Sequence, residues 1–285
     1  MIKKMKLKKL KCGLLILISI LVFSACESDT YENGANDAIE TEEANYVETE
    51  DSQTAYIETE DLEDSEELQV ANIEMENPQA DYIILPLPEL EGDMSVEAAL
   101  ANRRSRRNFQ DKALSTEQLS QILWAAYGIT APMPDAPRGG FRTSPSAGAT
   151  FPLEIYVIVG DVDGIEAGVY RYISEEHKIV RIIDGDVRSE LSEAALGQVM
   201  VKDAPASVFY SAVFERATGI YGERGIMYTH MEAGHSAQNI YLQAEALGLG
   251  TVAIGAFTDD RVRQLLNLPD DEEPLYLLPF GYFYD

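Results

Sequence analysis

The sequence predicts an α+β fold with a central, mainly antiparallel sheet flanked by helices. Three observations lead to this class. Runs dense in β-branched and aromatic residues, such as PLEIYVIVG at 152–160, predict strands. Apolar residues at helical spacing, as in 232–248, predict helices. The two kinds of segment are mixed without the strict alternation that is typical of a parallel sheet.

The first half of the domain is expected to contain, in order, an extended entry at 82–90, a short helix at 94–104, an amphipathic helix at 114–128 and an irregular loop at 130–140. Ser115 and Gln118 have capping-box spacing at the start of the second helix. The apolar face of that helix consists of Leu119, Ile122, Leu123 and Ala126. The loop is rich in proline and glycine, which disfavour regular structure.

The second half is expected to contain, in order, a strand at 152–160, a hairpin at 169–183, a helix at 187–199, a buried strand at 206–214, a long helix at 232–248, a strand at 252–257, a helix at 259–268 and a strand at 275–283. The hairpin turn falls near Ser174. Gly248 is able to end the long helix. The face of that helix that is expected to be buried consists of Ala233, Ala237, Ile240, Ala244 and Leu247.

The first 26 residues are typical of an export signal. Six lysines precede an apolar run of 14 residues, shorter than the roughly 18 to 20 that cross a bilayer. The run ends before Cys26 in a pattern that resembles the lipobox of bacterial lipoproteins, although Phe23 replaces the usual Leu. We expect 1–26 to be a signal peptide, Cys26 to be lipidated, and the protein to be an exported lipoprotein anchored on the outer side of the cytoplasmic membrane. An uncleaved anchor helix is the alternative.

Residues 27–80 contain 19 Asp and Glu and no Lys or Arg. A stretch so acidic cannot bury enough apolar surface to offset its ordering entropy, so we expect a disordered linker before a folded domain at 81–285. The formal net charge of −27 argues against nucleic acid as a partner. Cys12 and Cys26 are the only cysteines, and both are assigned to the signal and anchor. No thiol therefore remains for a disulfide, a nucleophile or a metal site.

One short segment, NRRSRRNF at 102–109, concentrates arginine in this acidic chain. Arg103, Arg104, Arg106 and Arg107 surround Ser105. Guanidinium groups recognise phosphate through several planar donors. A solvated helix end, where cations are also favoured, explains the composition equally well.

Two segments of small residues follow. PSAGA at 145–149 precedes a strand, and Gly248, Gly250 and Gly255 lie in a passage from helix to strand. Small residues allow backbone N–H groups to approach a flat ligand closely. Each segment alone is also compatible with an ordinary tight turn.

In their order and spacing, NRRSRRNF, PSAGATFPLEIYV, EAGHSAQNIYLQAEALGLGTVAIGAF and LPFGY resemble the FMN-dependent nitroreductase superfamily, and most of all its SagB-type dehydrogenase branch. The resemblance covers about residues 95–285. It implies a nitroreductase-like homodimer with FMN as cofactor, bound at two sites in the subunit interface.

The resemblance also assigns residues to this cofactor. It implies that the FMN phosphate and ribityl chain are held by Arg103, Arg104, Ser105 and Arg107. It implies that the isoalloxazine of the other protomer lies along Pro145, Ser146, Ala147, Gly148 and Ala149. The backbone of Gly255 and Ala256 is expected near flavin N5 and O4.

The chain departs from this pattern at two places. Many nitroreductases have a basic residue after the final Gly-Tyr, whereas here Gly281-Tyr282 is followed by Phe283, Tyr284 and Asp285. FMN binding is then weaker or depends more on the arginine cluster. SagB-type enzymes that oxidise azolines use a Lys-Tyr pair, and no Lys-Tyr dipeptide occurs in this sequence. That reaction is therefore rejected.

Other candidates carry weaker signals. Glu232 and His235 share a helix face, but structural or pocket roles are favoured over a metal site, for which His177 and His230 are the only further histidines. Arg138 and Arg142 are candidates for binding an anionic substrate or the flavin phosphate. Trp124, Tyr127 and Phe141 are candidates for the wall of an active site. Trp124 and Tyr127 lie on the predicted amphipathic helix, so we expect these two in the core instead.

The implied activity is that of an FMN-dependent oxidoreductase that transfers hydride at flavin N5 by a ping-pong mechanism. The flavin carries the chemistry, so no catalytic side chain and no metal are predicted. Two alternatives stay open: a lipoprotein with this fold that binds flavin without turnover, and a degenerate scaffold without cofactor. The donor, the small-molecule substrate and the direction of reaction are not fixed by the residues.

Overall fold

A seven-stranded sheet forms the centre of the structure, a computed structural model that describes residues 82–133 and 137–284. In sheet order its strands are β1 (Tyr82–Ile84), β6 (Lys178–Asp184), β5 (Gly168–Ile173), β4 (Leu153–Val159), β7 (Ala206–Ala212), β9 (Glu273–Gly281) and β8 (Gly250–Thr251). Every neighbouring pair is antiparallel, so the predicted fold class is confirmed. The predicted signal peptide with Cys26 and the predicted acidic linker lie outside the described residues.

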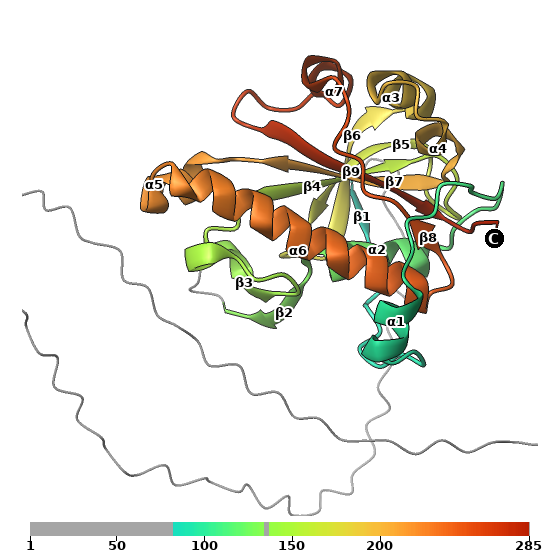
Figure 1. The fold of residues 1–285 in the computed structure, drawn as a ribbon, viewed down its shortest axis with the longest axis horizontal. Helices are drawn as coiled ribbons and strands as arrows, with labels where there is room; N and C mark the ends of the chain where they lie inside the picture. Colours follow the sequence, from blue (N-terminus) through green and yellow to red (C-terminus); the bar gives the residue numbers. More distant parts are fainter. Residues whose placement is uncertain (1–81, 134–136, 285) are drawn as a thin grey trace, which may run out of the picture. The chain divides into compact units, whose positions relative to one another are not determined.

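Helices cover both faces of this sheet (Figure 1). On one face lie α2 (Thr116–Tyr127) and α6 (Arg224–Ala246), which share a core with inward-facing residues such as Ile155 and Tyr210. On the other face lie α3 (Arg188–Ala194), α4 (Val199–Asp203) and α7 (Asp259–Leu265), packed around Tyr156 and Phe209. Within 82–133 and 137–284, no helix is both long and apolar enough to cross a membrane.

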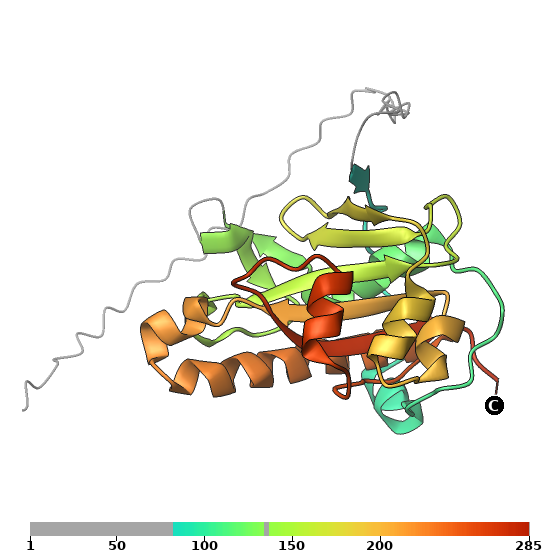
Figure 2. The ribbon, with the colours of Figure 1, turned by 90° about the horizontal axis from the view of Figure 1, so that it is seen from above.

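The remaining elements lie around α6. The short helices α1 (Val96–Asn102) and α5 (Glu215–Tyr221) lie at its opposite ends (Figure 2). A two-stranded sheet of β2 (Ile129–Pro132) and β3 (Gly140–Arg142) follows α2. Two turns of 3₁₀ helix, η1 (Pro137–Gly139) and η2 (Ala147–Ala149), complete the chain between β2 and β4.

Local signals in the sequence account for the helix ends. Ser115 Oγ accepts a hydrogen bond from Gln118 N at 3.2 Å, and Gln118 Oε1 accepts one from Ser115 N at 3.0 Å, which confirms the capping box. Helix α6 is longer than predicted at 23 residues, and its chain leaves through Gly248 at φ 68°. Positive φ is accessible to glycine without a side-chain clash, so the predicted stop is confirmed.

Three predicted elements differ from the structure. The segment predicted as an irregular loop is partly regular: residues 130–132 lie in β2 and Gly140 lies in β3, because Pro132 needs no ladder donor at an edge and Gly140 brings the two backbones into close contact. The helix predicted at 187–199 is divided into α3 and α4 by Leu196 and Gly197, which both have positive φ. The strand predicted at 252–257 is wrong: the ladder ends with β8 (Gly250–Thr251), and within 252–257 the structure shows one isolated bridge, from Ile254 to Leu277.

Candidate functional site

The arginine cluster, residues 103–107, follows the end of α1 and lies against β8. Ser105 and Thr251 form a parallel bridge, and Arg106 N donates to Thr251 O at 2.9 Å. A Cβ at Gly250 would lie 2.6 Å from Arg106 Cβ, closer than real side chains approach. Glycine at this position is therefore required for the two segments to touch.

Tyr241 of α6 joins the cluster to the segment after β8. Its hydroxyl lies 3.0 Å from Ser105 Oγ and accepts a hydrogen bond from Ala253 N at 2.8 Å. The Arg103 guanidinium lies 5.2 Å from the centre of the tyrosine ring. Because Ala253 N is bound by this hydroxyl, it is turned away from the β ladder, which explains why the predicted strand is so short. Sequence reasoning missed this tyrosine, whose only signal was its place in a predicted helix.

The individual arginines have different surroundings. Arg104 donates to Ala101 O at 3.0 Å and to Arg103 O at 2.8 Å, and so caps the last turn of α1. The Arg106 guanidinium lies 4.3 Å from the centre of the Phe283 ring. Arg107 is exposed, and its side chain has no hydrogen bond or ion pair with the other described residues. A cation from the cluster thus lies over the segment after Gly281-Tyr282, which itself carries no Lys or Arg.

Gly255 and Ala256 are exposed beyond this junction. The nearest side-chain atom to a Cβ at Gly255 would be Tyr276 Cε2 at 3.8 Å, so the protomer itself leaves this position open. Gln198, which the sequence did not single out, donates from Nε2 to Ala256 O at 2.9 Å and to Ala195 O at 3.0 Å. The backbone at 255–256 is held in place while one side of it stays accessible.

The PSAGA segment contains strained backbone. Gly148, Ala149 and Phe151 have φ of 58°, 51° and 43°, and two of the three are not glycine. Non-glycine residues in this region cost on the order of 1 to 3 kcal/mol each, and such strain clusters at functional sites. Ser146 Oγ accepts a hydrogen bond from Phe151 N at 2.9 Å and closes the turn. A Cβ at Gly148 would collide with the Tyr221 hydroxyl.

A cavity of about 240 Å³ lies between this segment and α6. It is lined by Pro145, Ser146, Ala147, Tyr228, Met231, Glu232 and His235. Glu232 is only 2 % exposed and accepts a hydrogen bond from the Tyr127 hydroxyl. Burial raises the pKa of the Glu232 carboxyl above its ordinary value, although hydrogen bonds from Ser146 and Tyr127 and the charge of Arg142 oppose the shift. A buried carboxyl group with a raised pKa therefore forms one wall of the cavity.

Helix α6 separates the predicted site residues into two groups. From Glu232, beside the PSAGA segment, to Tyr241, beside the arginine cluster, the helix rises by about 14 Å. Within the described part of the chain, no hydrogen bond or ion pair joins Arg103, Arg104, Ser105 or Arg107 to 145–149. The two groups are not brought together in one protomer, as expected for a site shared between two.

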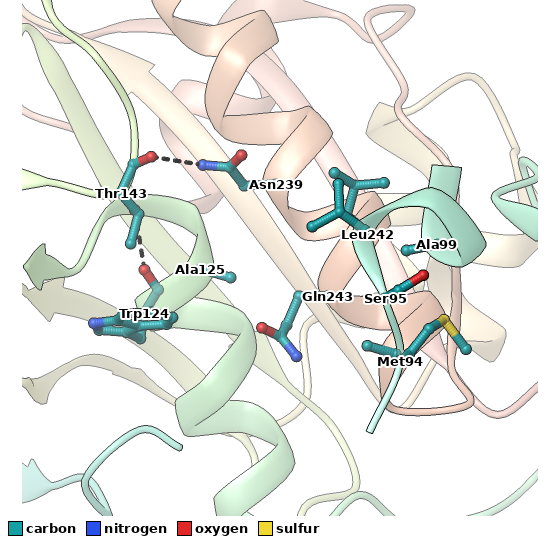
Figure 3. Close-up of a pocket in the computed structure, with 11 residues that line it drawn as sticks. Met94, Ser95, Ala99, Trp124, Ala125, Thr143, Asn239, Leu242 and Gln243 are labelled. Carbon is teal, nitrogen blue, oxygen red and sulfur yellow. Dashed lines mark hydrogen bonds between the residues drawn. The ribbon is translucent and has the colours of Figure 1, made fainter. Parts of the chain in front are cut away.

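A third region, between α1, α2 and α6, contains a cavity of about 320 Å³ (Figure 3). Asn239 Nδ2 donates to Thr143 O at 3.1 Å, and Thr143 Oγ1 donates to Trp124 O at 3.1 Å along one side of it. Trp124 and Gln243 also line it, and none of its lining residues is charged. This cavity offers no counter-ion for a phosphate.

The other candidates of the sequence have structural surroundings. His177 lies 2.8 Å from both Ser120 Oγ and Tyr172 Oη, and burial lowers its pKa. His230 Nδ1 is hydrogen-bonded to its own helix through Ile226 O. Tyr127 is buried in the core, whereas Phe141 is exposed. Among the described residues there is no cluster of three or more potential metal ligands.

Comparison with known proteins gives consistent matches. The nitroreductase family model matches residues 100–282. MJ1384 of Methanocaldococcus jannaschii is 49% identical over 201 residues, which span 70% of this chain and 97% of that protein. A crystal structure from Ralstonia eutropha JMP134 is 29% identical with a TM-score of 0.63, and the match covers 73% of this chain and 92% of that one.

A relative with a different role also matches. The Microcin B17-processing protein McbC of Escherichia coli is 28% identical over 181 residues. The match covers 61% of this chain and 65% of McbC, so about a third of McbC lies outside the match.

Proposed function

This chain belongs to the nitroreductase family, and from that membership we propose that it is an FMN-dependent oxidoreductase that passes electrons between a donor and a small-molecule acceptor. FMN is the cofactor that the family implies. The finer assignment to the SagB-type dehydrogenase branch is supported by the order of the four motifs and by the similarity to McbC. We do not extend it to azoline oxidation, because the sequence has no Lys-Tyr pair.

The observation that carries this proposal is the junction between the arginine cluster and the 250–256 segment. Exposed guanidinium groups lie next to a backbone that Gly250 and Tyr241 hold in place. Gly255 leaves room beside that backbone. A phosphate bound to the arginines and a flat ring beside Gly255 fit this arrangement, because the cations and the accessible backbone lie on neighbouring segments.

We assign each predicted site segment a role in binding the cofactor. Arg103 and Arg107 would bind the phosphate, and Ser105 would donate to the ribityl chain. The Gly255 and Ala256 backbone would orient the ring edge, and the PSAGA segment of the other protomer would cover its face. When bound, FMN supplies hydride transfer through N5. Donor and acceptor would use the same face in turn, which gives ping-pong kinetics.

We propose that the active form is a homodimer. Apolar side chains of Ile220, Tyr221, Ile226, Met227 and Met231 are exposed by 36 to 64% and form what we call the α5–α6 patch. Large exposed apolar patches mark interaction surfaces. This patch adjoins the PSAGA segment through Tyr221 and Met231, so pairing there would bring that segment to a second chain.

We further propose an exported lipoprotein with lipid on Cys26 and an extended acidic linker. Because NAD(P)H is scarce outside the membrane, a membrane-derived donor or a small substrate that is itself dehydrogenated fits this location. Partition of wild type into detergent, with Cys26→Ser remaining in the aqueous phase, is the expected result. Equal partition of both forms would contradict lipidation.

The cofactor is tested by the visible absorption of protein purified after addition and removal of excess FMN. We expect flavin bands in wild type that are lost in the Arg103→Ala, Arg107→Ala double variant. The matched control is Arg181→Ala with Arg261→Ala, which removes two surface ion-paired arginines from other faces. Loss of flavin in both double variants, or in neither, would contradict the phosphate assignment.

Turnover separates the enzyme from its alternatives. Anaerobic titration with donors should bleach the bound flavin, and an acceptor should restore it. Flavin that no donor reduces would identify a binding protein instead. Well-folded protein that retains no flavin would identify a scaffold without cofactor.

A further inference from the structure

The central sheet opens into a fork between β4 and β5. These strands pair only where Tyr156–Val159 faces Gly168–Arg171. Beyond that point β4 continues to Leu153 with β7 as its partner, and β5 continues to Ile173 with β6 as its partner. A cavity of about 80 Å³ lies in the fork and is lined by both strands. The sheet therefore contains a pocket at a place where a ladder would otherwise continue.

Guanidinium groups surround this fork. Arg171 Nη2 lies 2.6 Å from Glu154 Oε2, Arg216 Nη2 lies 2.5 Å from Glu154 Oε1, and Arg138 Nη1 lies 3.8 Å from the same Oε1. A fourth arginine, Arg142, is inserted from β3, where its Nη2 lies 2.9 Å from Glu175 Oε1. Three arginines thus share one carboxylate.

Carboxylates surround these guanidinium groups in turn. Arg138, Arg142, Arg171 and Arg216 form ion pairs with Glu154 and Glu175, and the charges of Glu232 and Glu272 act on Arg142 and Arg171. Burial lowers the pKa of Arg138, and the neighbouring charge of Arg216 lowers it further. Burial alone would raise the pKa of Glu154, but Arg171 and Arg216 hold it below its ordinary value.

Arg142 also has a donor left over. Its side chain is 3% exposed. Its Nη atoms donate to Tyr127 O, Ser174 Oγ, Arg138 O and Glu175 Oε1. Its buried Nε has no hydrogen-bond partner among the residues that the structure describes. A buried donor without a partner destabilises the folded state, so an acceptor at this point is favoured.

We propose that the fork is a binding site for a small, planar anion, namely a carboxylate or an oxyanion of the same size. A water molecule occupies roughly 30 Å³ in the liquid, so the cavity holds a group of about three non-hydrogen atoms. Such an anion accepts from Arg142 Nε and offsets the charge of Arg138 and Arg171. The side chains of the latter two are 37% and 34% exposed, so the ligand enters from solvent between them.

An anion bound in the fork would act on Phe151, two residues after the PSAGA segment. Arg216 Nη1 donates to Phe151 O at 3.1 Å, and the Arg142 guanidinium lies 4.8 Å from the Phe151 ring. Phe151 is one of the strained residues at positive φ. An anion that reduces repulsion between these arginines therefore stabilises the strained turn. The sequence made Arg138 and Arg142 candidates for an anionic substrate or the flavin phosphate. The site does not depend on the proposed function, because none of the residues proposed above to hold FMN lines the fork.

The test is thermal unfolding and titration calorimetry of the full-length, FMN-loaded protein with sodium formate. Formamide is the neutral analogue, and a bulky sulfonate keeps the ionic strength constant. We expect a saturable rise of the unfolding midpoint with formate and none with formamide. Equal effects of the two compounds would overturn the proposal.

Variants locate the binding. Arg138→Gln should raise the half-saturating formate concentration roughly tenfold, whereas Arg181→Gln, at a surface ion pair on β6, should not change it. Glu154→Gln should act in the opposite direction and lower that concentration roughly tenfold, because the competing charge is removed. If Glu154→Gln fails to fold, Arg138→Gln decides alone. Unchanged binding in Arg138→Gln would place formate elsewhere and overturn the site.

Discussion

The two groups of predicted flavin contacts are held in opposite ways. The arginine cluster is exposed, and it rests on a few backbone hydrogen bonds and on Tyr241. The PSAGA segment is strained at Ala149 and is supported from behind by buried groups such as Glu232. The first arrangement leaves cations accessible to a charged ligand. The second fixes the shape of a surface at a cost in stability, as sites that must be preorganised commonly do.

The difference assigns different tasks to the two groups. Affinity for a dianionic phosphate comes from positive charge that is accessible to the ligand. Such side chains are solvated in the free protein, so the fold depends little on them. Orientation of a flat ring comes from backbone that cannot move. Loss of an arginine should therefore weaken binding with little effect on folding, whereas changes in the PSAGA segment should affect both.

Separation of the two protomers should have the largest effect, because it removes the PSAGA segment from the arginine cluster of the other chain. In the α5–α6 patch, Ile226→Glu with Met227→Glu should give a monomer by size-exclusion chromatography. FMN affinity should fall by roughly 100-fold or more, which corresponds to about 2.7 kcal/mol. The apoprotein should unfold within a few degrees of wild type, since both side chains are exposed by about 45%.

The control for this prediction is Ile182→Glu with Leu196→Glu, which alters exposed apolar residues on other elements. It should stay dimeric and retain flavin. A monomeric patch variant that binds FMN as tightly as wild type would show that one chain contains a complete site, and the division of tasks would then be wrong.

Gly148→Ala should have the next largest effect, on the free energy of unfolding. The left-handed backbone at φ 58° costs about 1 to 2 kcal/mol for a non-glycine residue, and the collision with the Tyr221 hydroxyl adds about 1 to 3 kcal/mol. Urea unfolding of Gly148→Ala should show a fall in the free energy of unfolding equal to the sum of the two. Tyr221→Phe removes the colliding oxygen, so the double variant should recover the part of the free energy that is due to the collision. If the two substitutions are additive, the hydroxyl contact is not what restricts position 148.

The sequence was sufficient for the elements that local chemistry determines. Ser115 and Gln118 marked a helix start, Gly248 marked a helix end, and the β-rich runs marked the strands. The shortened β8 was not predictable, because the cause is a hydroxyl that arrives from Tyr241 in another element. The same holds for the fork: the sequence made Arg142 a candidate for binding an anion but gave no signal at Glu154, and only the separation of β4 from β5 brings the two residues to one cavity.

The predicted site shows the same limit. The four motifs named Arg103 and Ser146 as ligand contacts but did not show that α6 holds them apart. Their separation along one helix depends on how that helix packs on the sheet. Gln198 was missed as well, since its hydrogen bond to Ala256 O joins segments far apart in the chain.

The pH dependence of stability should expose the buried acid behind the PSAGA segment. Burial raises the pKa of Glu232 in the folded state, so the native protein binds more protons than the unfolded chain. Its contribution to stability is full below the unfolded pKa of about 4.3 and is lost as the pH rises through the folded value. Glu232→Gln should remove this loss, and urea unfolding should show a weaker decline in stability between acidic and alkaline buffer.

Glu223→Gln, at an exposed position before α6, is the matched control and should leave that decline unchanged. Glu272 is also buried with a raised pKa, but it is present in all three proteins and cancels in the comparison. A decline that is identical in Glu232→Gln and wild type would mean that folding does not raise the pKa of Glu232.

Arg104→Ala should have the smallest effect and should act on folding rather than on the ligand. Arg104 already donates to Ala101 O and Arg103 O at the end of α1, so it has less freedom than Arg107 to meet a phosphate. We expect Arg104→Ala to lower the free energy of unfolding by about 0.5 to 1.5 kcal/mol and to weaken FMN binding less than threefold. Arg107→Ala should show the reverse, with unchanged stability and FMN binding weakened roughly tenfold. Fluorescence titration with FMN and urea unfolding of both variants give the comparison. Equal loss of affinity would show that Arg104 leaves the helix end when the ligand arrives, and that the exposed cluster rearranges where the PSAGA segment cannot.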